Sequence, residues 1–158
     1  MATKANIEAP MINCGSTPFL MACQDGHLGV VERLMAAGAN VEASSSGVTP
    51  LLIASSTGQV EVVERLLAAG VNVDTTLRDG CTTSLYVACQ GGHFEVVELL
   101  LAAGANIDAT TDDGATPLCV ACHENHLPVA ELLLAAGANP ELMYGPDKPI
   151  IFLQAHWH

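Results

Sequence analysis

The sequence predicts an all-α repeat protein, a solenoid of stacked helix-turn-helix units with projecting, β-hairpin-like fingers. The main observation is a phrase similar to LAAGANID that occurs four times, with spacings of 32, 34 and 33 residues between its glycines, Gly38, Gly70, Gly104 and Gly137. Two other phrases keep the same register within each period. A period of this length is typical of repeat proteins, in which each unit buries its apolar face against its neighbours.

The first element of each unit is a short helix that begins at a Thr-Pro phrase. Thr can cap a helix with its hydroxyl, and Pro fits the first turn, where the N–H that it lacks would have no partner. A mostly apolar segment of about two turns follows. The third unit carries one extra residue and has Ser84 where Pro is usual. These helices are expected within GSTPFLMAC (15–23), GVTPLLIAS (47–55), GCTTSLYVAC (80–89) and GATPLCVAC (114–122).

A second helix follows a break at Gly-His or a similar pair. It has apolar residues at i, i+1, i+4 and i+5 with Glu outward, and the Gly after Ala-Ala fits a left-handed C-cap. The next residues run extended to a turn and form the finger, and the finger at 42–47 is one residue shorter than that at 74–80. These changes should alter finger tips without moving the stack. The second helices are expected within 26–34, 58–66, 92–100 and 125–133.

These phrases together resemble the ankyrin repeat, whose pattern is a finger with Asp-Gly-x-Thr-Pro-Leu, a first helix, Gly-His, a second helix and Gly-Ala-Asp/Asn. The resemblance covers essentially the whole chain. The start ANIEA matches ANVEA (39–43), and DKPIIFLQA near the end matches GATPLCVA, so we expect a piece of a longer array or a compact array with unusual caps. The predicted single array (1–158) comprises a partial finger (1–11), full repeats at 12–43, 44–76, 77–110 and 111–142, and a partial C-terminal repeat or cap helix (143–158).

The composition limits the possible partners. The chain has 17 Asp and Glu against 5 Lys and Arg, a net charge of −12. Such a chain is repelled by the phosphates of DNA, RNA and anionic membranes, whereas a basic protein segment is favoured. No apolar run approaches the roughly 20 residues of a membrane span, the start lacks a signal-peptide core, and the 6 cysteines are too sparse for a disulfide scaffold. We expect an intracellular, cytoplasmic monomer with reduced thiols.

The stretch LCVACHENH (118–126) contains the pattern Cys-x-x-Cys-His, which is found at haem attachment sites, and two Cys with two His that could bind zinc. The repeat offers a simpler explanation. Cys119 occupies a column of Leu and Tyr, Cys122 a column of small buried residues, and His126 the Gly-His column, so His123 alone is unexplained. We expect no metal and no cofactor, and keep a metal or redox role as a third alternative.

Three further columns have both a structural and a functional interpretation. The His column (His27, His93 and His126) should be spaced by about 10 Å, too far for one ion, and the resemblance implies that it supports the loop between helices. Paired glutamates on the second helices are interpreted as a solvated face, with Glu61 and Arg65 as an i, i+4 pair. Asn and acidic ladders either satisfy turn N–H groups or form an acidic stripe that attracts a basic segment; these are Asn6, Asn40, Asn72, Asn106 and Asn139 beside Glu8, Glu42, Asp74, Asp108 and Glu141.

The leading hypothesis for function is a non-enzymatic module that presents a concave, acidic groove to a protein partner. The sequence holds no Ser/His/Asp set, phosphate loop or catalytic Cys/His pair. The alternative is a passive spacer within a larger array. In the ankyrin family, partners usually contact finger tips and the exposed ends of first helices, and these columns vary between repeats here. The candidate residues are Asn13, Ser16, Gln24, Asp25, Ser45, Ser46, Val48, Ser56, Thr57, Arg78, Asp79, Cys81, Gln90, Gly91, Asp112, Asp113, Ala115, His123 and Glu124.

Overall fold

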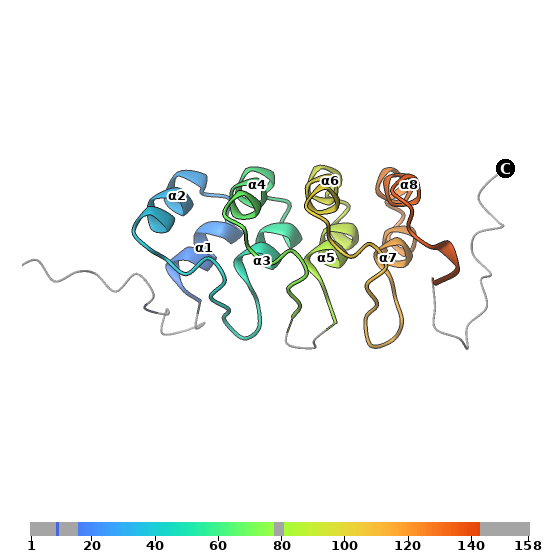
Figure 1. Ribbon diagram of the computed structural model, residues 1–158, viewed down its shortest axis with the longest axis horizontal. Coiled ribbons are helices and arrows are strands. Elements are labelled where there is room, and N and C mark those ends of the chain that lie inside the picture. The colour runs from blue at the N-terminus through green and yellow to red at the C-terminus, as the bar shows by residue number, and fades with distance from the viewer. Residues whose placement is uncertain (1–8, 10–15, 78–80, 143–158) are drawn as a thin grey trace, which may run out of the picture.

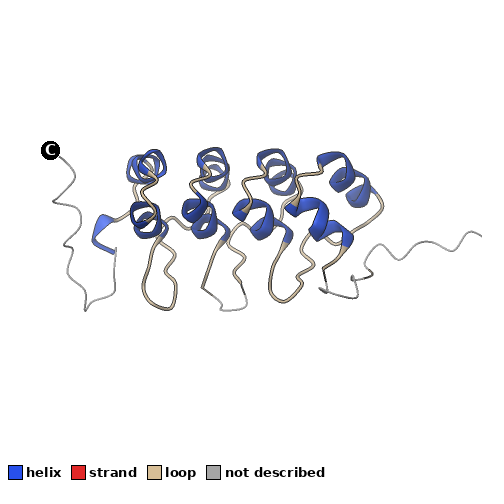
Figure 2. Ribbon diagram, turned by 180° about the vertical axis from the view of Figure 1, so that it is seen from behind, coloured by secondary structure: helices blue, strands red, loops and turns tan. Residues whose placement is uncertain are grey.

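The computed structural model describes residue 9, residues 16–77 and residues 81–142, and it shows four helical pairs in a row (Figure 1). The predicted fold class is confirmed. The second helices form one layer, the first helices form another, and the fingers project beyond the first helices (Figure 2). The first helices are α1 (Pro18–Gln24), α3 (Pro50–Ser56), α5 (Ser84–Gly91) and α7 (Pro117–His123); the second are α2 (Leu28–Ala36), α4 (Val60–Ala68), α6 (Phe94–Ala102) and α8 (Leu127–Ala135).

A short 3-10 helix, η1 (Pro140–Leu142), follows α8. Within the described residues, the fingers pair through single bridges, Ser45 with Val48 and Thr76 with Thr83. The partial repeats predicted at the two ends lie outside the described residues, apart from residue 9.

Each first helix begins as its sequence predicts. The hydroxyl of Thr49 accepts a hydrogen bond from the backbone N–H of Leu52 at 3.3 Å, and the threonines before the other three first helices do the same. Pro occupies the first helical position of α1, α3 and α7, and Ser84 takes it in α5. The cap and the missing N–H together set the start of the helix.

Each second helix ends at a glycine in the left-handed region, as predicted. The φ angles of Gly38, Gly70, Gly104 and Gly137 lie between 78° and 94°. A residue with a β-carbon would be strained there. Glycine is therefore the residue that lets the chain turn out of the helix at little cost. This turn directs the chain back toward the first helices and into the next finger.

The core is continuous through the described repeats. Leu51, Leu85 and Leu118 of successive first helices are at most 2% exposed, and the second helices contribute valines and leucines that are equally buried. Val30 and Leu127 are 47% and 53% exposed, although other repeats cover the equivalent side chains at least partly. These two residues lie on the outermost described repeats, where one neighbour is absent from the described residues, so their exposure reflects their place in the row.

Successive repeats are joined by the Gly-His column. The His93 Nε2 lies 3.1 Å from the Ser56 carbonyl oxygen, and the His126 Nε2 lies 3.0 Å from that of Gln90. A carbonyl only accepts, so each imidazole donates. Gln59 donates in the same way to the Gln24 carbonyl at 3.1 Å. The column was expected to support the loop between helices, and these bonds hold the C-terminal end of the first helix of the preceding repeat, where that loop begins.

The Asn and acidic ladders, which follow the second helices, also join successive repeats. The Asn72 side chain accepts from the Asp74 N–H at 3.1 Å, and the Asp74 carboxylate accepts from the Asn106 N–H at 2.9 Å. The same two bonds recur along the row. These contacts favour the structural interpretation of the ladders, because the carboxylates are used to bond the backbone of the next repeat.

Candidate functional site

The candidate residues that the structure describes share one side of the molecule, called the groove face below. It is formed by the fingers and by the ends of α1, α3, α5 and α7, away from the layer of second helices (Figures 1 and 2). Asn13, Arg78 and Asp79 lie outside the described residues. All the described candidates except Ala115 are exposed or half-buried. Ten of the described candidates line two separate hollows; the other six, Asp25, Ser56, Thr57, Cys81, Gly91 and Asp112, line neither.

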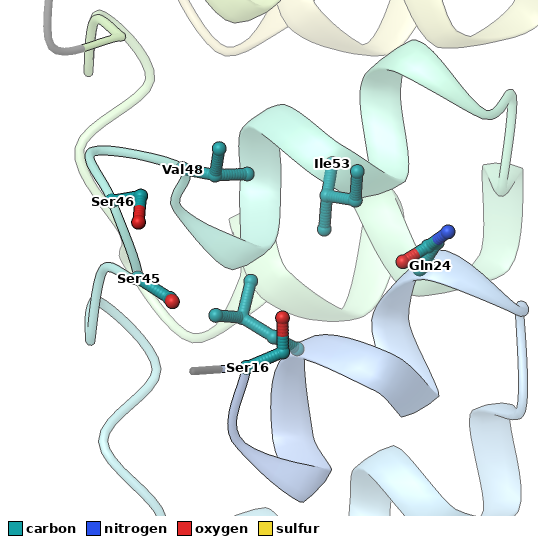
Figure 3. A pocket seen from close by; sticks show the side chains of 7 residues that line it. Ser16, Gln24, Ser45, Ser46, Val48 and Ile53 are labelled. Carbon is teal, nitrogen blue, oxygen red and sulfur yellow. The ribbon is translucent and has the colours of Figure 1, made fainter. Parts of the chain in front are cut away.

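The neutral hollow lies between the first two repeats and has a volume of about 200 Å³. The finger contributes Ser45, Ser46 and Val48, and Ile53 comes from the middle of α3 (Figure 3). Its lining contains apolar groups and neutral polar groups but no charged side chain. The full lining is Ser16, Leu20, Gln24, Ser45, Ser46, Val48 and Ile53.

The finger above this hollow is a tight hairpin. Ser45 and Val48 exchange two backbone hydrogen bonds of 3.1 and 2.9 Å, and the residues between them, Ser46 and Gly47, have φ of 55° and 87°. Positive φ at both central residues is the type I′ geometry that joins two antiparallel strands. The shorter finger noted in the sequence is therefore a two-residue loop, and it fixes the serine hydroxyls at the edge of the hollow.

The acidic hollow lies between α5 and α7 and has a volume of about 320 Å³. Tyr86 belongs to the first turn of α5, and Asp113 and Glu124 stand at the finger and at the C-terminal end of α7. The Glu124 carboxylate lies 3.1 Å from the His123 ring. The full lining is Tyr86, Gln90, Asp113, Ala115, Cys119, Val120, His123 and Glu124.

The phenol of Tyr86 reports the electrostatics of this hollow. Burial raises the pKa of Tyr86, and Asp113, Cys119 and Glu124 raise it further. A higher pKa means that the phenolate, an anion, is disfavoured there. Burial disfavours a charge of either sign, but the negative field of Asp113 and Glu124 favours a cation over an anion in this hollow.

The finger that carries Asp113 is held in place by its own hydrogen bonds. The Thr111 N–H donates to the Ala115 carbonyl at 3.0 Å, and the Thr111 hydroxyl is bonded to both Asp113 and Ala115. Gly114, with φ of 81°, closes the turn. Neighbouring fingers are also linked, because the Cys81 thiol donates to Asp112 at 2.8 Å. The carboxylates of this region are therefore positioned by the fold.

Ala115 differs from the other candidates. It is 8% exposed, and its N–H and carbonyl both bond Thr111. Because it is buried and both of its backbone groups are bonded within the finger, it can contribute only to the floor of the acidic hollow and is not an exposed contact residue.

Five residues that line the hollows were not among the residues predicted from the sequence. Leu20, Ile53, Tyr86 and Val120 lie on first helices in mostly apolar columns, which were assigned to the core, and the same holds for Cys119. Tyr86 carried a usable signal, because an aromatic residue replaces the Leu found at the same position in two other repeats. It is half-buried, whereas those leucines are 3–4% exposed.

The Cys-x-x-Cys-His stretch is dispersed by the fold. Cys119 is buried, whereas Cys122 is exposed, and His126 is engaged by the Gln90 carbonyl. The expectation that Cys122 is buried was wrong. Its counterparts Cys23, Ser55 and Cys89 are each followed by another first helix, but no first helix follows α7 within the described residues. In residues 16–77 and 81–142, no group of three or more His, Cys, Asp or Glu is placed to bind a metal ion.

The cations of the described residues lie away from the groove face. Arg33 belongs to α2 and Arg65 to α4. The expected pairing of Arg65 with Glu61 was wrong, since the Arg65 Nε lies 3.6 Å from the Glu32 Oε1 on the preceding second helix. Both side chains are about half exposed, so this ion pair adds little stability.

Comparisons with known proteins agree with this architecture. A family model described as ankyrin repeats in three copies matches residues 2–77 and 70–144, which is most of the chain. A search of curated proteins finds no match. None of the described helices has the length and apolar character needed to cross a membrane. Ankyrin repeats are in general non-enzymatic modules for protein–protein interaction, and this chain, with its four stacked helical pairs and projecting fingers, belongs to the ankyrin-repeat family.

Proposed function

We propose that this chain binds a protein segment along its groove face. One observation supports this proposal above the others. Residues that repeat unchanged along the chain serve the core, the caps and the bonds between repeats, whereas the finger tips and the ends of the first helices vary from repeat to repeat and lie together on one exposed face. Variation on such a face is expected if that face recognises a partner and the repeated residues hold it in shape.

The hydrogen-bond network supports a preformed site. The carbonyls of Gln24, Ser56 and Gln90 are held by the next repeat, and these residues lie in the last turn of the first helices, at the groove face. Binding to a rigid surface loses less conformational freedom than binding to a mobile one. The frame therefore favours recognition without a large rearrangement of the chain.

The size of the hollows favours a protein segment over a small molecule. Their volumes are about 200 and 320 Å³, at or below the lower end of the roughly 300–1,000 Å³ found for small-molecule sites. Each can take one side chain. Two such hollows on one face suit a chain that presents several side chains at once.

The charge of the groove face supports a basic segment as the partner. Asp25, Asp112, Asp113 and Glu124 lie on it, and the described arginines lie on second helices. Attraction between opposite charges speeds the encounter of two proteins, and salt screens this attraction. We therefore expect partner binding to weaken as the salt concentration rises from 50 to 500 mM.

Site-specific photocrosslinking tests the proposal. A photoreactive amino acid replaces Ser56 on the groove face in one preparation and Glu64 on α4 in another, and both are irradiated in cell extract. We expect covalent adducts to one protein from position 56 and none of that protein from position 64. Adducts from position 64 alone would contradict the proposal. Adducts from neither position would favour a passive spacer.

A further inference from the structure

The two hollows differ in chemistry, and this difference restricts what can bind. The neutral hollow offers Leu20, Val48 and Ile53 with serine hydroxyls at its edge. The acidic hollow offers an aromatic ring with two carboxylates. An apolar side chain suits the first hollow and a cation suits the second.

An arginine fits the acidic hollow better than any other side chain. Its planar guanidinium can stack on the Tyr86 ring and donate to the carboxylates of Asp113 and Glu124 at the same time. Burial is the main cause of the raised pKa of the Tyr86 phenol, and Asp113 and Glu124 raise it further, so the negative charge of both carboxylates reaches this ring. Lysine carries the same charge, but it lacks the flat surface for stacking.

The spacing of the hollows sets a spacing in the partner. One hollow lies between α1 and α3 and the other between α5 and α7, so they are two helix steps apart. Packed helices are separated by 8–10 Å, which places the hollows roughly 16–20 Å apart. An extended chain rises about 3.3 Å per residue and alternates its side chains, so residues roughly six positions apart cover this distance on one face.

We propose that the groove face recognises an extended protein segment through two side chains, an apolar one in the neutral hollow and an arginine in the acidic hollow, six positions apart. This inference rests on the proposed function and names the class of partner. It predicts a short linear motif with one apolar and one arginine anchor, separated by five residues that make weaker contacts.

The test selects binders from a phage-displayed library of random dodecapeptides on the full chain. The selected peptides should carry Arg six positions from Leu, Ile, Val or Met. Replacing that Arg by its neutral isostere citrulline should weaken binding about tenfold, and replacing it by Lys should weaken binding severalfold. Moving the two anchors to a separation of three should abolish the contribution of one of them.

Matched variants of the protein are available from its own repeats. Tyr86→Leu places at position 86 the residue found in the same column at positions 20 and 52, so the fold should tolerate it, and it should weaken Arg peptides about fivefold. Asp113→Asn with Glu124→Gln should do the same and remove most of the salt dependence. The control, Glu64→Gln with Glu98→Gln, makes an equal change of charge on the second helices and should leave binding unchanged.

The outcomes separate this inference from the proposed function. Peptides that crosslink to position 56 but lack Arg, or that bind Tyr86→Leu and the Asp113/Glu124 variant as tightly as the parent chain, would overturn the two-anchor motif and leave the groove face as the binding site. Peptides that crosslink only from position 64 would overturn both. A selection that yields no binder would count against the motif, since the library contains it many times.

Discussion

At the scale of single residues, two glycines with the same backbone conformation, Gly58 and Gly70, have different roles. Gly58 and Gly70 have φ of 72° and 78°, so both avoid the strain that a side chain would bring. A β-carbon on Gly58 would meet the His93 ring at 2.6 Å, whereas one on Gly70 would have nothing within 4 Å. Gly70 is needed for its conformation alone, and Gly58 also makes room for the imidazole of the next repeat.

Substitution by alanine separates these two roles. Gly70→Ala should lower the free energy of unfolding by about 1 kcal/mol through left-handed strain. Gly58→Ala should cost about 1–2 kcal/mol more, because the His93 ring must move and its bond to Ser56 is lost. Urea denaturation measures both. The double change Gly58→Ala with His93→Ala should recover part of the extra cost. Equal costs for the two glycine variants would show that the fit of the His93 ring against Gly58 does not contribute to stability.

In the last full repeat, asparagine replaces the glycine that makes room for the next imidazole. Asn125 stands where the other repeats have glycine, and its φ is 61°. Asn tolerates the left-handed region better than other residues with a side chain. No His from a following repeat lies against it within the described part of the chain, so the space that glycine provides elsewhere is not required here.

The buried thiols predict a loss of stability at high pH. Burial raises the pKa of Cys23 from 9.0 to about 12 and raises that of Cys89 as well. The folded state therefore keeps protons between pH 9 and about 12 that the unfolded chain releases, so the stabilisation is complete below pH 9 and is lost as the pH rises through this window. We expect the free energy of unfolding to be lower at pH 10 than at pH 7.

The Cys23→Ala/Cys89→Ala variant tests the cause of this pH dependence. It should lose less stability than the parent chain between pH 7 and pH 10, as measured by urea denaturation at each pH. An identical loss in both proteins would show that other groups are responsible.

At the scale of the elements, helix α5 differs from the other first helices at its first position. The first helical position holds Ser84 instead of proline, and its hydroxyl is buried without a hydrogen-bond partner among the described residues. The cap residue, Thr83, has φ of −88° and ψ of 165°, a conformation that also suits a residue before proline. The backbone is therefore already prepared for the residue that three other repeats carry.

Ser84→Pro should raise the free energy of unfolding by about 1 kcal/mol. The proline restricts the unfolded chain and removes a buried hydroxyl that has lost its bonds to water. Thermal denaturation should show a higher Tm. The reverse change, Pro117→Ser in α7, should lower it, and a destabilised Ser84→Pro variant would show that the extra residue in this finger has altered the start of α5.

The elements were more predictable than the contacts between them. Thr caps, prolines and glycines act on their own few residues, so the bounds of the helices could be read from local sequence. The partner of Arg65 was predicted wrongly, because Glu32 on the preceding helix competes with Glu61 on its own, and only packing decides between them. The hollows were not predictable, because they depend on side chains from two repeats and a finger, as Tyr86 and Asp113 illustrate.

At the scale of the whole molecule, the four described repeats form a row in which each repeat touches its neighbours. Helix α2 packs on α4, and α4 packs on α6. Val31, Val63 and Val97 lie on these three helices, and all are completely buried. Stability in such a row is approximately a sum of terms for the repeats and for the interfaces between neighbours. Substitutions in adjacent repeats should therefore interact, and those in separated repeats should not.

Double-mutant cycles with alanine measure this difference. Each single change should cost about 2 kcal/mol, since it removes two buried carbons and leaves a small cavity. Val63→Ala with Val97→Ala should deviate from additivity by at least about 0.5 kcal/mol, because the two sites share the α4–α6 interface, and Val31→Ala with Val97→Ala should be additive within that limit. A coupling as large for the separated pair as for the adjacent pair would mean that the array responds as one rigid body, and a bound segment in the acidic hollow would then also stabilise the first repeat.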